Sequence, residues 1–171
     1  MKKLYAPWRH DYVTGLEKKK DKKELVNECI FCDHFAQKDD ARVFILKRLK
    51  NCGIIMNYYP YSAGHVMIIP YKHVQTLTQL TPEIRAELME ATNLSLDIIT
   101  RTLKCEGTNI GLNLGKAGGG GIQEHLHIHV LPRWLGDTNF MATLAETTII
   151  STDFHEIYKT LKNAFNTGDS L

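Results

Sequence analysis

The stretch GGGGIQEHLHIHVLPRW, residues 118–134, places three histidines at alternate positions after a run of four glycines. Successive side chains of a β-strand point to opposite faces, so His125, His127 and His129 share one face and the apolar residues between them share the other. On a helix, His127 would turn away from its two neighbours. The β-branched residues and the following proline favour a strand. A polar outer strand face would explain a lone histidine, but it does not explain three in period beside a glycine-rich loop. Imidazole suits nucleophilic or acid–base chemistry near neutral pH.

The glycines before the histidines indicate a loop that can approach an anion. A loop without Cβ atoms lets backbone N–H groups come close to a phosphate. GKAGGGG (115–121) is not a Walker loop, because Lys116 precedes Ala117 rather than Ser or Thr and the loop leads into a strand. Taken alone, it reads as a mobile turn. Beside the histidine row it is a candidate phosphate-binding loop.

Working outward, the remaining pattern predicts an α+β domain with a five-stranded, mainly antiparallel sheet. One long helix is expected from about Thr81 to Leu103, with Thr81 as its cap and Pro82 in its first turn. Its apolar stripe comprises Ile84, Leu88, Ala91, Leu94, Leu96, Ile98 and Ile99. A second helix should close the chain at 154–165. The expected strands are 42–48, 52–59, 65–70, 108–115 and 124–132.

Composition sets further bounds on the class of protein. The chain has 171 residues, of which 43% are hydrophobic, and a net charge of +2. This suits one globular domain, and we expect no nucleic-acid partner and no membrane partner. No apolar run reaches the ~18 residues of a membrane span and no signal peptide is apparent, so we expect a cytoplasmic protein with reduced cysteines. EKKKDKK (17–23) reads as a solvated linker, with contact to a polyanion as the alternative.

Two segments carry a resemblance to a known family. HLHIHVL (125–131) resembles the His-φ-His-φ-His-φ-φ signature of the histidine triad (HIT) superfamily, where φ is apolar, and GHVMIIP (64–70) resembles its upstream Gly-His strand. APWR (6–9) and PRWLGDTNFM (132–141) resemble more specifically the bacterial branch of diadenosine tetraphosphate phosphorylases or hydrolases. The resemblance implies a HIT-like fold with a five-stranded antiparallel sheet.

The resemblance also implies a division of the chain and an assembly. Residues 1–26 would form an N-terminal extension, 27–135 the HIT domain, and 136–171 a C-terminal extension that packs on the domain. Members of the family usually pair into dimers with a continuous sheet. We therefore expect a homodimer in which the strand at 108–115 and the long helix contribute most of the contact.

The resemblance implies roles for the histidines. In the family, the middle histidine of the triad attacks the α-phosphorus of a nucleotide, which points to His127 as the nucleophile. A covalent nucleotidyl-imidazole forms, and water or phosphate then releases the nucleotide. The backbone carbonyl of His125 would hold the other nitrogen of His127. His129 and the loop N–H groups would stabilise phosphoryl charge, and His65 matches the family's upstream histidine.

Substrate contacts are implied in the same way. Asn57 lies eight residues before His65, where the family carries Asp or Asn to bind the ribose hydroxyls. Asn113 matches a polar residue that contacts phosphate ahead of the glycine loop. The loop is one residue longer than in the best-known members, and Gly121 stands where they carry a polar residue. The phosphate contacts would come from Gly119, Gly120 and Gly121.

CIFC (29–32) is a Cys-x-x-Cys pair whose possible uses are zinc binding, redox chemistry or none. Some bacterial HIT proteins and the related galactose-1-phosphate uridylyltransferases add two histidines to such a pair, and the matching positions are His73 and His125. The resemblance thus implies one structural zinc per chain on Cys29, Cys32, His73 and His125. Same-face residues of a strand lie ~7 Å apart, so zinc on His125 would leave the nucleophile free.

Three functional hypotheses remain at this point. The leading one is an enzyme that attacks the α-phosphate of dinucleoside polyphosphates, such as diadenosine tetraphosphate, or of related nucleotides. A second is a zinc-dependent hydrolase with His125, His127 and His129 on one catalytic metal, which would leave CIFC without a purpose. A third is a nucleotide-binding module without turnover, which would not need His127.

Overall fold

A computed structural model describes residues 29–145, 150 and 152–167. The expected N-terminal extension and the APWR and EKKKDKK segments lie outside the described residues. The described chain forms a five-stranded sheet in the order β1-β2-β3-β5-β4, and every neighbouring pair is antiparallel. The predicted α+β fold is therefore confirmed. The strands are β1 (Ile45–Arg48), β2 (Cys52–Met56), β3 (Val66–Pro70), β4 (Gly107–Leu112) and β5 (Ile128–Arg133).

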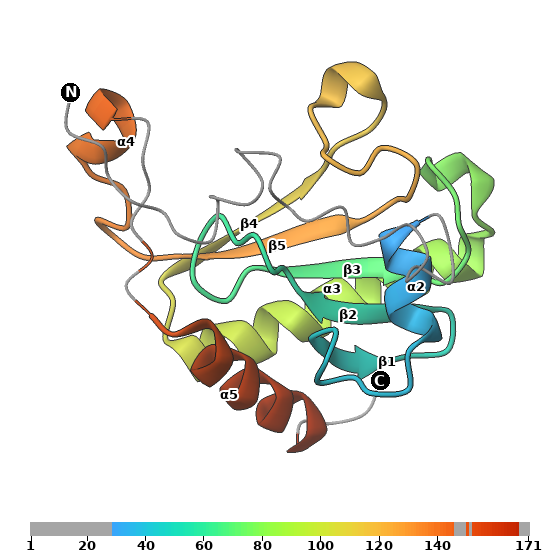
Figure 1. Cartoon of the computed structure of the whole chain (residues 1–171), viewed down its shortest axis with the longest axis horizontal. Coiled ribbons are helices and arrows are strands. Elements are labelled where there is room, and N and C mark those ends of the chain that lie inside the picture. The colour runs from blue at the N-terminus through green and yellow to red at the C-terminus, as the bar shows by residue number, and fades with distance from the viewer. Residues whose placement is uncertain (1–28, 146–149, 151, 168–171) are drawn as a thin grey trace.

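Helices cover both faces of the sheet (Figure 1). The long helix α3 (Pro82–Leu103) packs on one face, where it meets Ile128 and Val130 of β5. The short helix α2 (Ile30–Ala36) packs on the other, against Met67 of β3 and its neighbours. The remaining helical elements are α4 (Phe140–Ala145), α5 (Phe154–Thr167), which packs against α3 and β1, and the 3₁₀ turns η1 (Leu77–Gln79) and η2 (Lys116–Gly118).

The long helix has the bounds that its sequence signals predict. Thr81 Oγ1 accepts a hydrogen bond from the Ile84 N–H, and Pro82 occupies the first helical position, where its missing N–H costs nothing. Lys104 ends the helix in the left-handed conformation at φ 54°. Leu88, Ala91, Ile98 and Ile99 of the expected stripe are buried against the sheet. No described helix has both the length and the apolarity to cross a bilayer.

Each of the five predicted strands is too long at one end. β1 begins at Ile45 because the preceding residues turn, with Phe44 at φ 58°. β2 ends at Met56 rather than 59. β3 begins at Val66 rather than 65, and β4 ends at Leu112 rather than 115. β5 begins at Ile128 rather than 124, because its pairing with β3 stops at Ile68 and Ile128, and the Leu126 N–H bonds instead to Val74 O. His125 and His127 therefore lie on the segment that leads into β5.

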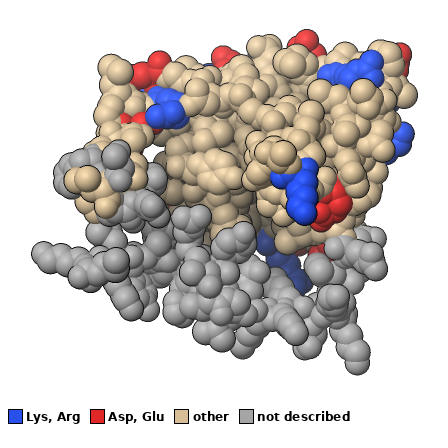
Figure 2. All heavy atoms as spheres, turned by 90° about the horizontal axis from the view of Figure 1, so that it is seen from above, with Lys and Arg blue, Asp and Glu red and all other residues tan. Residues whose placement is uncertain are grey.

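Charges on the described surface are mixed. On the face seen in Figure 2, Lys and Arg side chains are scattered and have Asp and Glu side chains near them, with largely neutral surface between. This is the distribution expected of a chain whose net charge is only +2.

Candidate functional site

The three histidines of the row lie buried on the face of the sheet that α2 covers. His125, His127 and His129 are 1%, 6% and 6% exposed. His127 Nδ1 lies 2.8 Å from the backbone carbonyl oxygen of His125. A carbonyl only accepts, so Nδ1 carries the proton and donates it. In the neutral ring, Nε2 is then an unprotonated nitrogen with a free lone pair.

A chain of hydrogen bonds sets the tautomers of the neighbouring histidines. The Tyr61 N–H donates to His65 Nδ1 at 3.2 Å, so the proton of a neutral His65 resides on Nε2. His65 Nε2 lies 2.8 Å from His129 Nδ1 and donates to it. The proton of a neutral His129 must therefore sit on Nε2. The backbone of the loop before β3 thus turns His129 Nε2 into a hydrogen-bond donor.

Burial keeps these rings neutral. It lowers the pKa of His65 to about 3 and that of His129 to about 4, and the adjacent imidazoles add to both shifts. Burial also lowers the pKa of His127, against the opposing effect of its bond to the His125 carbonyl. At neutral pH, His127 therefore offers a lone pair and His129 offers an N–H.

Asn57 is brought to this histidine pair. It is 9% exposed, and its Nδ2 lies 3.2 Å from the unprotonated His65 Nδ1, to which it donates. Its Oδ1 accepts from the Tyr59 N–H at 3.0 Å. A carboxamide oxygen has two lone pairs, so one remains for a further donor such as a hydroxyl.

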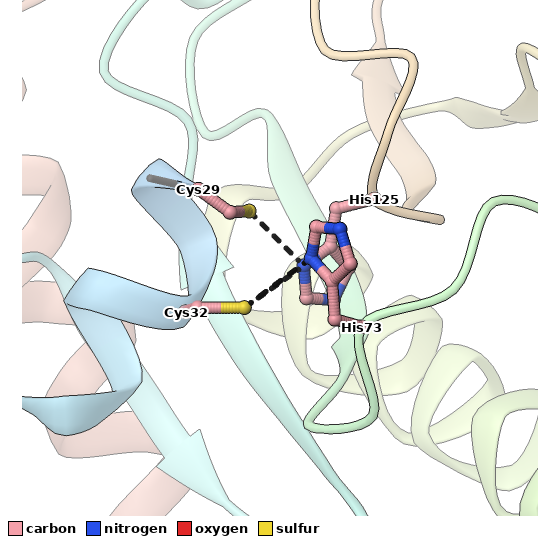
Figure 3. A group of neighbouring side chains, drawn as sticks. All are labelled: Cys29, Cys32, His73 and His125. Carbon is pink, nitrogen blue, oxygen red and sulfur yellow. Dashed lines mark hydrogen bonds between the residues drawn. The ribbon is translucent and has the colours of Figure 1, made fainter. Parts of the chain in front are cut away.

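The Cys-x-x-Cys pair meets two histidines from distant parts of the chain (Figure 3). Cys29 and Cys32 extend from α2, while His73 follows β3 and His125 precedes β5. Their ligand atoms all lie within 4.8 Å of one another. The structure therefore gathers the four residues that the sequence singled out, although the pair opens a helix that the sequence analysis did not predict.

The geometry of this cluster fits a tetrahedral zinc ion. Cys29 Sγ and Cys32 Sγ lie 3.3 and 3.6 Å from His125 Nδ1, and Cys32 Sγ lies 3.4 Å from His73 Nδ1. Usual Zn–S and Zn–N lengths at tetrahedral angles give S···N separations of about 3.6 Å. His125 Nε2 donates to Pro70 O at 2.8 Å, which leaves Nδ1 unprotonated toward the sulfurs. Burial and the nearby Cys29 raise the pKa of the Cys32 thiol to about 11, so a metal would have to displace its proton.

The same bonds argue against one catalytic metal on all three histidines. Both ring nitrogens of His125 are engaged, one by Pro70 O and one within the cysteine cluster. His127 and His129 direct their Nδ1 atoms at the His125 carbonyl and at His65. The three histidines therefore have two different settings. His125 belongs to the Cys/His cluster, whereas His127 and His129 form a pair of imidazoles whose ring centroids are 4.7 Å apart.

The glycine loop packs closely around Asn113. Gly119 adopts φ 77°, and a Cβ on Gly120 would approach Asn113 Cβ to 3.2 Å, so a side chain is disfavoured at both positions. The loop ends at Ile122, which packs on the α2 side of the sheet. This brings the end of the loop to the face that carries the histidines.

Two contributors to the site escaped the sequence analysis. One is Tyr61, whose backbone N–H sets the His65 tautomer, and the other is Phe31, whose ring contacts His125 and His127. A backbone donor leaves no mark on the residue type, so Tyr61 had no signal. Phe31 had one, because it is an aromatic residue inside the Cys-x-x-Cys motif.

A five-stranded antiparallel sheet with an alternating histidine row on one face defines a histidine triad protein. The chain belongs to the HIT domain family, whose model matches residues 38–134. A protein of Mycobacterium tuberculosis named AP-4-A phosphorylase is 35% identical over 150 residues, which cover 88% of this chain and 77% of that protein.

Two further comparisons bear on the site. The bis(5'-nucleosyl)-tetraphosphatase [asymmetrical] of Schizosaccharomyces pombe is 25% identical over 125 residues, which cover 73% of this chain and 65% of that protein. The crystal structure of a Zn-bound histidine triad family protein from Mycobacterium smegmatis superposes with a TM-score of 0.67 at 27% identity, covering 81% of this chain and 94% of that one. This protein thus has relatives named for dinucleotide chemistry and a structural neighbour that binds zinc.

Proposed function

We propose that this protein is a nucleotidyl hydrolase or transferase that cleaves dinucleoside polyphosphates, such as diadenosine tetraphosphate, or related nucleotides at the α-phosphate. The reaction proceeds through a covalent nucleotidyl intermediate on His127. The observation that carries the proposal is the hydrogen bond from His127 Nδ1 to the His125 carbonyl, because it leaves Nε2 as a free nucleophile beside the donor His129.

The proposed reaction has two steps, and both take place at His127. His127 Nε2 attacks the α-phosphorus, the N–P bond forms, and the bond to the departing polyphosphate oxygen breaks. His127 then bears positive charge, which the His125 carbonyl stabilises through Nδ1–H. The His129 Nε2–H, oriented by His65, stabilises charge on the phosphoryl oxygens. Water or inorganic phosphate next attacks the phosphorus, and the N–P bond breaks with its electron pair returning to Nε2, so His127 is neutral again. When water is the acceptor, its proton passes to solvent.

Asn57 and the glycine loop are the proposed partners of the ribose and of the phosphate chain. Asn57 Oδ1 has a lone pair left for a ribose hydroxyl. The backbone N–H groups of Gly119, Gly120 and Gly121, with Asn113 behind them, would hold the phosphate chain, since a loop without side chains allows close approach.

A product screen tests this proposal. The protein is incubated with diadenosine tetraphosphate, with and without inorganic phosphate, and the products are separated by chromatography. Transfer of AMP to water yields AMP and ATP, whereas transfer to phosphate yields ADP and ATP. We expect ADP to dominate when phosphate is present, as the name of the Mycobacterium tuberculosis relative suggests. Absence of turnover with every dinucleotide tried would refute the proposed activity.

We further propose that Cys29, Cys32, His73 and His125 hold one structural zinc ion per chain. The donor set and its spacing fit zinc, and a closed site of four protein ligands serves structure rather than catalysis. Such a site requires reduced thiols, which supports a cytoplasmic location.

We also propose that the protein acts as a homodimer joined through β4 and α3. Within the described part of the chain, β4 pairs only with β5, and its Ile110 is 51% exposed. Met89 on α3 is 61% exposed. An edge strand with apolar residues is a surface that a second copy can cover.

Light scattering at micromolar concentration tests the dimer. We expect twice the chain mass of 19.5 kDa, and the Ile110→Lys variant should shift the protein toward the monomer, because it buries a charge at the proposed contact. A chain mass that stays at the monomer value on concentration contradicts the proposal.

A further inference from the structure

Phe31 contacts both His125 of the Cys/His cluster and His127, the proposed nucleophile. It lies between Cys29 and Cys32 on α2, and it is 3% exposed. While the two cysteines extend toward His125 (Figure 3), the Phe31 ring packs edge-on against two histidines. Its centroid lies 5.6 Å from that of His125 at 86°, and 5.2 Å from that of His127 at 61°. Edge-to-face contacts at such distances are attractive and directional.

His127 needs a lateral support of this kind. The ring is anchored by one hydrogen bond, from Nδ1 to the His125 carbonyl, and a single bond leaves the ring free to swing about it. His129 lies against it at 4.7 Å and 78°. Phe31 is the other aromatic ring in contact with it within the described chain. A nucleophilic nitrogen must be held close to its attack line, since small displacements of reacting atoms cost large factors in rate.

We propose that Phe31 is a positioning residue that holds the His127 imidazole in its attack orientation and shields it from water, so that docking of the Cys-x-x-Cys helix also aligns the nucleophile. Its kinetic consequence rests on the proposed nucleotidyl transfer, whereas its effect on the accessibility of His127 does not. The two cysteines secure α2 to His125, and the residue between them meets the ring two positions further along the chain.

Two substitutions on the same helix separate this role from general packing. Phe31→Leu keeps an apolar side chain, smaller than that of the parent, but removes the ring from the histidines. Phe35→Leu is the matched control, because its ring packs on Tyr71 at 4.9 Å and has no contact with the histidine row. Zinc content should be the same in both variants and the parent, since all four proposed ligands remain.

The first measurement is the rate at which diethyl pyrocarbonate modifies His127, followed by mass spectrometry of the peptide that contains it. This reagent acylates accessible neutral imidazoles and needs no substrate. We expect several-fold faster modification in Phe31→Leu and an unchanged rate in Phe35→Leu. Equal rates in Phe31→Leu and the parent would overturn the proposal, and so would an equal increase in Phe35→Leu.

The second measurement is the kinetic split with a dinucleotide substrate. Phe31→Leu should lower kcat by about tenfold or more with little change in KM, because the contact affects alignment rather than substrate binding. If Phe31→Leu does not fold, Phe31→Met, which also lacks the ring but has a longer and more adaptable side chain, takes its place in both measurements. If the parent turns over no nucleotide, the proposed function fails, while the modification rates still decide the role of Phe31.

Discussion

We expect the His127→Asn variant to lose more than about 10³-fold in kcat while it retains the parent's fold and zinc content. Asparagine can keep a donor near the His125 carbonyl, but it has no nucleophilic nitrogen. Since His127 Nδ1 is committed to that carbonyl, no other atom of the row has the same free lone pair in the same place. The variant should also fail to retain radiolabelled nucleotide after an alkaline quench, which preserves a phosphorus–nitrogen bond.

The control is His155→Asn, which changes an exposed histidine on α5. Its kcat should match the parent value, because α5 packs on the opposite side of the sheet from the row. A His127→Asn variant within about tenfold of the parent rate would show that His127 is not the nucleophile. Loss of activity without loss of the trapped label would move the covalent step to another residue.

The bounds of helix α3 and the two faces of strand β5 could be predicted from the sequence, because their local signals are strong. Helix α3 has a capping threonine, a proline at its first position and an apolar stripe, so its bounds followed directly. The alternation in β5 correctly placed Ile128 and Val130 against α3 and the histidines on the other face. Its start was wrong because strand length depends on the partner strand, here β3, and not on the alternating pattern itself.

Helix α2 shows where local signals fail. It has seven residues, and Cys29 at its N-cap makes no side-chain capping bond. An isolated helix of this length is unstable. Its stability comes from distant residues, since the Arg48 guanidinium donates to Phe35 O and Gln37 O at its C-terminal end, and Phe31 is buried against the histidines. None of these contacts has a pattern within the CIFC segment.

The composition of the site was predictable, but its proton arrangement was not. Spacing and resemblance named the Cys/His cluster and the neighbouring Asn57, His65, His127 and His129, which the structure brings together. The phosphate contacts of Asn113 and the glycine loop stay a prediction. The tautomers depend instead on backbone groups, namely the carbonyls of Pro70 and His125 and the N–H of Tyr61. Any residue type supplies such groups, so their positions emerge only from the fold.

The second large effect is expected at the cysteine cluster. We expect about one zinc per chain in the parent, prepared without added metal, and none in the Cys29→Ser/Cys32→Ser variant. The variant's unfolding midpoint should fall by about 10 °C or more, since structural zinc contributes several kcal/mol and each kcal/mol is worth about 2–4 °C in a chain of this size. Elemental analysis and thermal unfolding measure the two quantities. Cys105→Ser, which alters a buried thiol near the end of α3, is the control and should retain its zinc.

Stability should suffer more than chemistry in this variant, and the bonding of the row explains why. The His127 Nδ1 proton is held by the backbone carbonyl of His125, not by the ring that faces the cysteines, so the free lone pair on Nε2 survives loss of the metal even where Phe31 aligns the ring less well. That carbonyl lies on the segment leading into β5, where the bond from Leu126 N–H to Val74 O joins the chain beside His125 to the chain beside His73 and does not itself need the metal. Below its lowered midpoint, the variant should therefore keep a measurable kcat, unlike His127→Asn. Equal zinc in variant and parent, or no zinc in the parent, would rule out this metal site, and a rate as low as that of His127→Asn would assign the metal a direct part in the reaction.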